Sequence, residues 1–345
     1  MNAWSAGRLA VVASLSLAAA GCQNLVEEVL GAKRQDAKAI NITMVAKSSS
    51  NPVFLSARVG AEAAAKDLSD KHKRIEVKID WRTPKTEDAR GQAERIRNAV
   101  ADGTDAIIVS CSDEEVLTKA IDEAVGRGVP VMTFDSDAPR SKRFAFYGPN
   151  DEEIGEAVMN ELAKLMGNQG QVAILGGNQA APNLAKRVEG VKKAAAKYPG
   201  IRLVGPFFHP ETAEDAAAEV LRVNRAHPGL GGWAMIGGWP LFSGALLDKI
   251  DPRKLKIVAV DALPVQLPYV EKGIVPVLLA QPTFKWGKVS VEKVIEKIHL
   301  KKDVPAINEM KLIRVSKDNL GGWARQLKAW GYVDVPERYL TYVAE

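Results

Sequence analysis

The sequence predicts an α/β fold made of two similar doubly wound parallel-sheet domains, each with helices on both faces of its sheet. From residue 40 onward, short apolar runs alternate with stretches of helical period. The alternation starts again at Asp151, after one complete set of strands and helices. The apolar run at 129–134 ends abruptly in Asp135-Ser136-Asp137, as a parallel strand buried on both faces would. Strands that alternate with helices in this way form parallel sheets with right-handed crossovers.

The first set of elements occupies residues 40–150. We expect strands at 40–46, 75–81, 106–110, 129–134 and 143–147, and helices at 52–69, 86–101 and 113–125. Within 52–69, helical spacing is shown by Phe54, Ala57, Ala61, Ala65 and Leu68. Gly148-Pro149-Asn150 then leads into an acidic first turn, which suits a helix N-terminus and indicates a hinge into the second domain.

The second set repeats this order. We expect helices at 151–166, 182–198, 211–225, 241–250, 263–272 and 284–300, and strands at 172–175, 203–208, 233–236, 256–260, 275–280 and 310–315. Pro264 and Pro268 interrupt the helix at 263–272. The segment that follows is too aromatic for a loose end, with Trp323, Trp330, Tyr332, Tyr339 and Tyr342, so we expect it to pack on one domain.

Length and charge exclude several classes of protein. A chain of 345 residues can form two full cores, and its composition fits neither a disordered nor a membrane-spanning protein. The net charge of +5 arises from 47 basic and 42 acidic residues that are mixed along the chain. Because no basic stripe with interleaved aromatic residues is present, we expect a solvated mixed-charge surface and no nucleic-acid partner.

The amino terminus predicts export. Arg8 precedes an apolar run at 9–20, which is too short to span a bilayer and has the length of a signal-peptide core. Ala19-Ala20-Gly21-Cys22 resembles the bacterial lipoprotein cleavage signal, although Ala19 stands where Leu is usual. We therefore expect a signal peptide at 1–21, lipidation of Cys22 and a tether at 22–38. An ordinary secretory signal, the alternative, would export the chain as well.

Cysteine and histidine residues give no sign of a metal site or a cofactor. The chain has two cysteines, and lipidation of Cys22 would leave Cys111 unpaired, so we expect no disulfide. Cys111 follows a buried strand and no histidine lies near it in the pattern, which favours a structural thiol over a nucleophile. No phosphate-binding loop, dinucleotide fingerprint, nucleophile elbow or zinc-protease motif occurs.

Polar residues gather where the predicted strands end, which is the edge at which open α/β sheets bind ligands. Asp135 and Asp137 follow one strand, Asp261 follows another, and Gln281 follows a third. Arg187 offers a forked donor for two adjacent oxygens. Phe54 and Trp239 could cover the apolar face of a ring. Helix capping explains any one polar residue about as well as ligand contact does. For Asp135, Asp261 and Gln281 together we favour ligand contact, because each directly follows a buried run.

The same stretches resemble the periplasmic sugar-binding proteins of the ribose-binding type, a family of type I periplasmic binding proteins. The resemblance is carried, in order, by SSSNPVF at 48–54, GTDAII at 103–108, VPVMTFD at 129–135, RVEG at 187–190, AHP at 226–228, VAVD at 258–261 and AQP at 280–282. It implies two lobes joined by a three-segment hinge near Tyr147, Gln281 and Lys311. Residues 39–146 plus 282–310 would form the N-terminal lobe, and 147–281 plus 311–345 the C-terminal lobe with the Trp-rich tail.

The resemblance also implies the ligand contacts. Asn51, Phe54 and Asp135 would contact a sugar from the first lobe, and Asp261 and Gln281 would do so from the second lobe and the hinge. Arg187 or the nearby Asn183 would be the donor. Three departures leave the identity of the sugar open, namely Ser136 in place of an arginine, Val53 in place of a second aromatic residue, and Gly238-Trp239 in place of Asn-Asp.

The implied function is capture of a monosaccharide or a related polyol by hinge closure, and its delivery to the permease of an ABC importer. Such a protein would be a periplasmic or cell-surface monomer held to a membrane by its lipid, and not an enzyme. A sugar sensor that docks on a membrane receptor is one alternative. A sugar-processing enzyme that uses Asp135 and Asp137 as its acid and base is another. A lac-repressor-like regulator would need a helix-turn-helix before residue 40, where the export signal stands.

Overall fold

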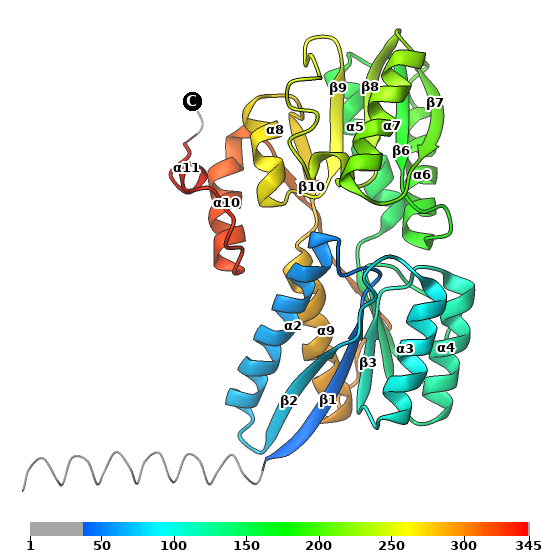
Figure 1. Ribbon diagram of the computed structural model, residues 1–345, viewed down its shortest axis with the longest axis vertical. Helices are drawn as coiled ribbons and strands as arrows, with labels where there is room; N and C mark the ends of the chain where they lie inside the picture. The colour runs from blue at the N-terminus through cyan, green and yellow to red at the C-terminus, as the bar shows by residue number, and fades with distance from the viewer. Residues whose placement is uncertain (1–36, 344–345) are drawn as a thin grey trace, which may run out of the picture.

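The computed structural model describes residues 37–343, so the predicted signal peptide, the lipidated Cys22 and nearly all of the tether lie outside the described residues. Two lobes, each built on a six-stranded sheet, lie one above the other (Figure 1). The predicted fold class is confirmed. Among residues 37–343, no helix has both the length and the apolar character that crossing a bilayer requires.

The first sheet has the strand order β11-β5-β4-β3-β1-β2. Its strands, in chain order, are β1 (Lys38–Val45), β2 (Ile75–Trp81), β3 (Ala106–Val109), β4 (Val131–Phe134), β5 (Ala145–Gly148) and β11 (Ile307–Glu309). All pair in parallel. Helices α2 (Pro52–Lys71) and α9 (Thr283–Ile298) cover one face, and α3 (Ala89–Ala101) and α4 (Glu114–Gly126) cover the other (Figure 1). We call this unit the first lobe.

The second sheet has the order β12-β10-β9-β8-β6-β7. Its strands are β6 (Gln169–Gly176), β7 (Gly200–Phe208), β8 (Leu230–Met235), β9 (Lys256–Val260), β10 (Val277–Ala280) and β12 (Ile313–Val315), of which β12 is antiparallel to β10. Helices α5 (Asp151–Leu165) and α6 (Pro182–Ala195) cover one face, and α7 (Ala213–Ala226) and the short α8 (Leu267–Glu271) cover the other. We call this unit the second lobe.

Local chemistry starts the helices that flank the junction of the lobes. Asn51 caps α2 by accepting a hydrogen bond from the amide of Val53, and Pro52 occupies the first turn, where its missing N–H costs nothing. Asn150 caps α5, whose first turn contains Asp151, Glu152 and Glu153 on the positive end of the helix dipole. Both helices therefore begin at residues that their caps define, Asn51 and Asn150, next to the hinge.

Helices α2 and α9 pack with their backbones in close contact. A Cβ atom added at Gly60 would lie 1.9 Å from the carbonyl oxygen of Phe284, and one added at Gly287 would lie 1.8 Å from that of Ala57. Only glycine permits this approach, so these two residues fix α9 against α2, although the two glycines are 227 positions apart in the sequence. In this way α9, which follows the second lobe's β10, returns to the first lobe.

The chain crosses between the lobes three times. The crossings lie between β5 and α5, between β10 and α9, and between β11 and β12. The expected single strand at 310–315 is wrong, because the third crossing divides it. Residues 307–309 join the first sheet and residues 313–315 join the second.

The expected helix at 241–250 is also wrong. A three-residue 3₁₀ turn, η1 (Trp239–Leu241), is followed only by bends and turns. The Tyr269 hydroxyl donates to the carbonyl of Ser243 at 2.5 Å and accepts from the amide of Leu246 at 3.3 Å, so these backbone groups are taken by a side chain. Gly244 and Ser243 further disfavour helix. Leu246 and Ile250 are nevertheless buried, which explains the apolar spacing.

The segment after β12 packs on the second lobe. It contains the 3₁₀ turn η3 (Lys317–Asn319) and the helices α10 (Leu320–Ala329) and α11 (Glu337–Leu340). Trp323 and Tyr339 are buried in the core that α7 and α8 also build. The indole of Trp323 donates to the carbonyl of Ala262 at 2.7 Å. After β9, the chain at 263–272 forms the 3₁₀ turn η2 (Pro264–Gln266) and the five-residue helix α8. The two prolines of this stretch disfavour one longer helix.

Candidate functional site

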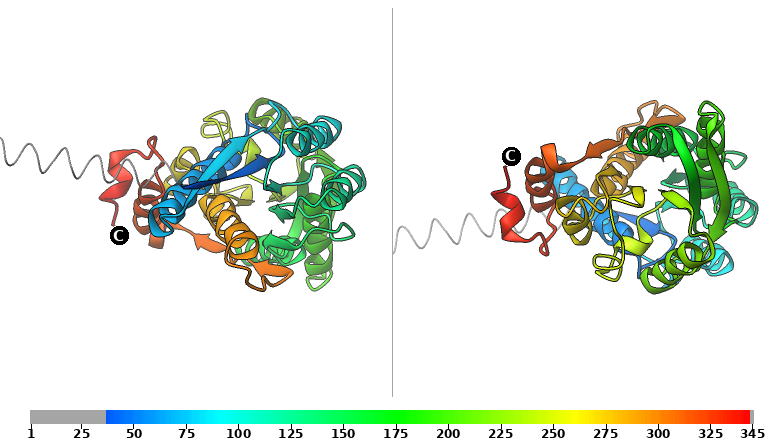
Figure 2. Two further views of the ribbon diagram at one scale, coloured as in Figure 1. Left: turned by 90° about the horizontal axis from the view of Figure 1, so that it is seen from below. Right: turned by 90° about the horizontal axis from the view of Figure 1, so that it is seen from above.

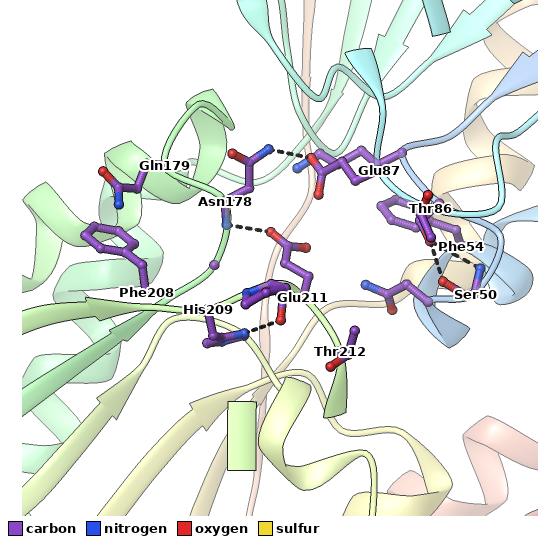
Figure 3. Close-up of a pocket in the computed structure, with 15 residues that line it drawn as sticks. Ser50, Phe54, Thr86, Glu87, Asn178, Gln179, Phe208, His209, Glu211 and Thr212 are labelled. Carbon is purple, nitrogen blue, oxygen red and sulfur yellow. Dashed lines mark hydrogen bonds between the residues drawn. The ribbon is translucent and has the colours of Figure 1, made fainter. Parts of the chain in front are cut away.

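A cavity of about 710 Å³ lies between the two lobes (Figure 3). The first lobe contributes Lys47, Ser48, Ser50, Asn51, Phe54, Thr86 and Glu87, and the second contributes Gly177, Asn178, Gln179, Phe208, His209, Pro210, Glu211 and Thr212. These residues end or follow β1, β2, β6 and β7 or begin the next helix, so the walls are the carboxyl edges of the parallel strands of two sheets. A volume in this range suits a small organic ligand.

Phe54 supplies the aromatic surface of the cavity from the first turn of α2. Its ring packs edge-on against Phe134 at 6.4 Å and is stacked on Trp286 at 5.9 Å between centroids. Asn51 lies one turn earlier, where its side-chain oxygen is used as the helix cap and its amide nitrogen is left for another acceptor. Both predicted residues line the cavity.

Lys47 carries a charge deep in the cavity wall. Only 3% of the residue is exposed, and its ammonium donates to Asn183 Oδ1 of the second lobe at 2.9 Å. Burial alone would lower the pKa of Lys47, but the carboxylates of Asp135, Glu87 and Glu211 outweigh it and hold the pKa above its usual value. Lys47 therefore stays protonated and serves as a donor.

Asp135 lies next to this contact, directly after β4. Its backbone adopts φ of 57°, a left-handed conformation that aspartate tolerates better than most side chains. Its carboxylate accepts from Ser110 Oγ at 2.7 Å and from Asn183 Nδ2 at 3.4 Å. Asn183 thus contacts a cation and an anion of the opposite lobe at once. Asp135 and Asn183, which were predicted separately as ligand contacts, are therefore neighbours in the structure.

Arg187 organises a second buried cluster in the second lobe. It donates to Asp151 Oδ1 at 2.8 Å, to the carbonyl of Ile236 at 3.1 Å and to Gln281 Oε1 at 3.0 Å. Burial raises the pKa of Asp151 to about 6, although Arg187 opposes this shift. Since each nitrogen of the guanidinium has a protein acceptor, Arg187 positions other residues rather than presenting a free fork.

Asp261 and Gln281 complete that cluster. The Gln281 amide donates to Asp261 Oδ1 at 2.9 Å, and the amide of Gly238 donates to Asp261 Oδ2 at 3.2 Å. Asp261 has φ of 69°, so Asp135 and Asp261, each of which directly follows a strand, share a left-handed backbone conformation. Burial raises the pKa of Asp261. The structure brings Arg187, Asp261 and Gln281 together, but outside the cavity wall.

Glu87 and Glu211 face the cavity from opposite lobes (Figure 3). Asn178 donates its side-chain amide to Glu87 at 3.0 Å and its backbone amide to Glu211 at 2.9 Å. Burial raises the pKa of Glu211 to about 7, and the charge of Glu87 adds to the shift. A carboxyl group whose pKa lies near neutrality changes its charge within the physiological range of pH.

Trp239 lies behind Glu211 rather than in the cavity. Its indole donates to Glu211 Oε2 at 3.2 Å, and His209 packs edge-on against its ring at 5.1 Å. Burial lowers the pKa of His209, whose Nδ1 lies 2.7 Å from the carbonyl of Pro210. Because a carbonyl only accepts, the neutral ring carries its proton on Nδ1. The structure places Trp239 as a support for Glu211.

Asp137 is the predicted residue that lies apart from the others. Arg143 binds both its oxygens, at 2.5 and 2.6 Å, and Thr133 donates to it at 2.6 Å. It lines a different cavity of about 320 Å³ on the side of Arg143 and Ile307. A carboxylate that is already paired in this way holds its own turn in place.

Lys47, Glu87 and Glu211 were missed from the sequence. Each follows a strand that was identified, namely β1, β2 and β7, so applying the strand-end rule to every strand would have found them. They were missed because a lone charged residue next to a helix start is usually a solvated cap. Lys47 differs from a solvated surface lysine in being buried, and it contacts Asn183 of the second lobe, which the sequence does not show to be near it.

The arrangement is rich in hydrogen-bond acceptors with an aromatic face at one side. Hydroxyl groups of a ligand satisfy carboxylate and amide oxygens, and such buried acceptors discriminate against analogues without those hydroxyls. Within the described part of the chain, no three His, Cys, Asp or Glu residues gather in a geometry that could hold a metal ion.

A family model described as a periplasmic binding protein domain matches residues 42–302. A D-ribose/D-allose-binding protein of Pseudomonas aeruginosa is 26% identical over 159 residues, which cover 44% of this chain and 49% of that protein. A xylitol-binding protein of Mycolicibacterium smegmatis is 24% identical over 193 residues, 55% of this chain and 52% of that protein. The chain thus spans about half the length of the curated relatives it matches.

Solved structures match over a longer range. An ABC transporter solute-binding protein from Burkholderia graminis, in complex with D-arabinose, is 28% identical, with a TM-score of 0.76 over 82% of this chain and 97% of that one. A carbohydrate transporter solute-binding protein from Agrobacterium radiobacter, also with D-arabinose, gives a TM-score of 0.76 at 23% identity, over 85% of this chain and 98% of the other.

Proposed function

The chain belongs to the periplasmic binding protein family, and from this premise we propose that it captures a monosaccharide or a related polyol between its two lobes. The observation that carries the proposal is the interlobe cavity, in which Phe54 offers a ring-sized apolar surface and both lobes present buried or half-buried acceptors. Sugars have this same division, with C–H groups on the ring faces and hydroxyls around the edge. The names of the similar proteins, which bind ribose, allose, xylitol and arabinose, support the class.

The ligand takes over hydrogen bonds that the lobes make with each other in this structure. Lys47 with Asn183 and Glu87 with Asn178 join the first lobe to the second, and Asn183 also reaches Asp135. When the lobes separate, water replaces these partners, and a ligand that displaces this water must supply hydrogen bonds of its own because a polar group left buried without a partner is costly. Ligand hydroxyls supply such partners. Asn51, Phe54, Lys47 and Glu211 contact the ligand in the cavity, and Asp135 and Asn183 lose their contact with each other and gain ligand contacts as the hinge opens. Asp261 and Gln281 contact the ligand from the second lobe, where they already bond to each other.

We further propose that the protein is exported, anchored through lipid on Cys22, and delivers its ligand to the permease of an ABC importer. The apolar run at 9–20 and the small residues before Cys22 support export and lipidation. The relation to ABC transporter solute-binding proteins supports the importer. Mass spectrometry of the protein purified from bacterial membranes tests the anchor, because lipidation adds a diacylglyceryl mass at an N-terminal Cys22. An unmodified N-terminus elsewhere would refute it.

Thermal unfolding in the presence of candidate ligands tests the binding proposal. The chain beginning at Gln23 is heated with pentoses, hexoses and inositols, and with nucleosides and amino acids for comparison. A ligand bound only by the folded state at a hundredfold over its Kd stabilises by about 2.7 kcal/mol, which raises the Tm by a few degrees. A saturable rise confined to sugars or polyols supports the proposal, whereas a rise confined to nucleosides or amino acids contradicts it.

A further inference from the structure

The aromatic C-terminal segment contacts both lobes, although its helices are anchored on one of them. Anchoring in the second lobe is firm, because Leu320, Ala324 and Leu327 of α10 are buried in that lobe's core. The Tyr339 hydroxyl of α11 donates to Glu271 at 2.7 Å, next to Arg338 at 3.2 Å from the same carboxylate. The segment therefore moves with the second lobe.

The turn between α10 and α11, residues 330–332, reaches the first lobe. The ring of Trp330 is stacked on Phe284 of α9, with 5.9 Å between centroids and 2° between planes. The Tyr332 hydroxyl lies 3.1 Å from Thr283 Oγ1, so the two hydroxyl groups share a hydrogen bond. Burial raises the pKa of Tyr332 to about 12, so this phenol stays neutral. Tyr332 packs against the cores of both lobes. A Cβ added at Gly331 would lie 3.6 Å from Val59 of α2.

These contacts lie beside the hinge and outside the ligand cavity. Thr283 and Phe284 begin α9 immediately after the second crossing, and none of residues 316–343 lines the cavity between the lobes. Views along the long axis show α10 and α11 at one side of the molecule, next to α2 of the first lobe (Figure 2). Rotation of one lobe against the other must shift Trp330 on Phe284 and Tyr332 on Thr283.

We propose that the C-terminal segment is a strap across the hinge, anchored in the second lobe by α10 and α11 and held to the first lobe by Trp330 and Tyr332. It acts as a fourth, non-covalent link beside the three covalent crossings, and it holds the lobes near the orientation of this structure. The strap sets how far the ligand-free protein opens. The inference depends on relative motion of the lobes and not on the identity of the ligand.

The test measures the distance between the lobes without ligand. Spin labels are placed at Glu94 on α3 and Glu214 on α7, which are exposed on different lobes, in the full chain with Cys22→Ser. Cys111 is buried and stays unlabelled. Pulsed electron paramagnetic resonance then gives the distribution of distances for the parent chain and for Trp330→Ala. The strap predicts a broader distribution extending to larger separations in Trp330→Ala.

Two further variants complete the test. Tyr332→Phe removes only the hydroxyl that reaches Thr283, and it should shift the distribution in the same direction by a smaller amount. Val333→Ala is the matched control, because Val333 is the next residue, is 89% exposed and should leave the distribution as it is. Identical distributions in all four proteins overturn the strap, and so does a shift of equal size in Val333→Ala. Thermal unfolding of each variant confirms that the lobes remain folded.

Discussion

Lys47 and Asn183, which lie on different lobes, are joined by a hydrogen bond of 2.9 Å from the lysine ammonium to the asparagine side-chain oxygen. Both residues are buried, at 3% and 5% exposure. The amide nitrogen of the same asparagine lies 3.4 Å from Asp135, so one side chain of the second lobe faces both charges of the first. Contact between the lobes is thus built from the same polar groups that line or adjoin the ligand cavity.

Replacement of Asn183 by leucine should destabilise the protein. The change keeps the size of the side chain but leaves the buried Lys47 ammonium without its hydrogen-bond acceptor. An unsatisfied buried donor costs about 1–3 kcal/mol. Urea unfolding measures the loss, with the exposed Gln179→Leu on the neighbouring loop as control. If Asn183→Leu lowers the free energy of unfolding no more than Gln179→Leu does, the contact contributes nothing to stability.

Arg187→Met should be more damaging, because Asp151 would be buried without its cation. Removing one partner of a buried ion pair typically costs about 3–5 kcal/mol. Chemical denaturation followed by circular dichroism gives the value. Arg222→Met is the matched control, since Arg222 forms a similar short pair with Glu219 on the exposed face of α7, and it should change little. Equal losses in the two variants would contradict the organising role of Arg187.

Glu211 should make stability depend on pH. Its pKa is raised from 4.5 to about 7 in the folded protein, so between these values the folded state binds more proton than the unfolded state. Stability from this group is therefore full below about pH 4.5 and is lost as the pH rises towards 7. Glutamine cannot lose a proton, so Glu211→Gln should gain stability relative to the parent as the pH rises. Parallel curves of Tm against pH would refute the shift.

Much of the fold follows from the sequence because the strands of a doubly wound sheet are buried on both faces. Runs such as residues 106–109 are wholly apolar and stand out without any knowledge of their neighbours. The prediction of a helix at 241–250 was wrong because a distant residue, and not the local pattern, determines the backbone there. There the apolar spacing is real, but Tyr269, which lies 23 residues away from Leu246, decides the backbone conformation.

Residues of the candidate site could likewise be predicted where local sequence fixes them, and could not where distant partners decide their role. Phe54 and Asn51 line the cavity as expected, because a strand-end loop and a helix start fix them locally. The role of Arg187 depends on Asp151, Ile236 and Gln281, which no local pattern brings together. Asp137 shows most clearly what the sequence does not predict, since only the structure reveals that Arg143 already binds both oxygens of its carboxylate.

The most direct test of the central claim is a calorimetric titration with the sugar or polyol that stabilises the chain most. The parent chain is compared with Asp135→Asn and Asp261→Asn, one from each lobe, and with Asp137→Asn as the control that lies outside the site. Loss of a hydrogen bond to a charged group is worth about 1.5–3 kcal/mol, or roughly 10- to 150-fold in Kd. We predict this loss for Asp135→Asn and Asp261→Asn, with unchanged affinity in Asp137→Asn. Full affinity in both Asp135→Asn and Asp261→Asn would contradict the account in which these two aspartates hold the ligand between the lobes.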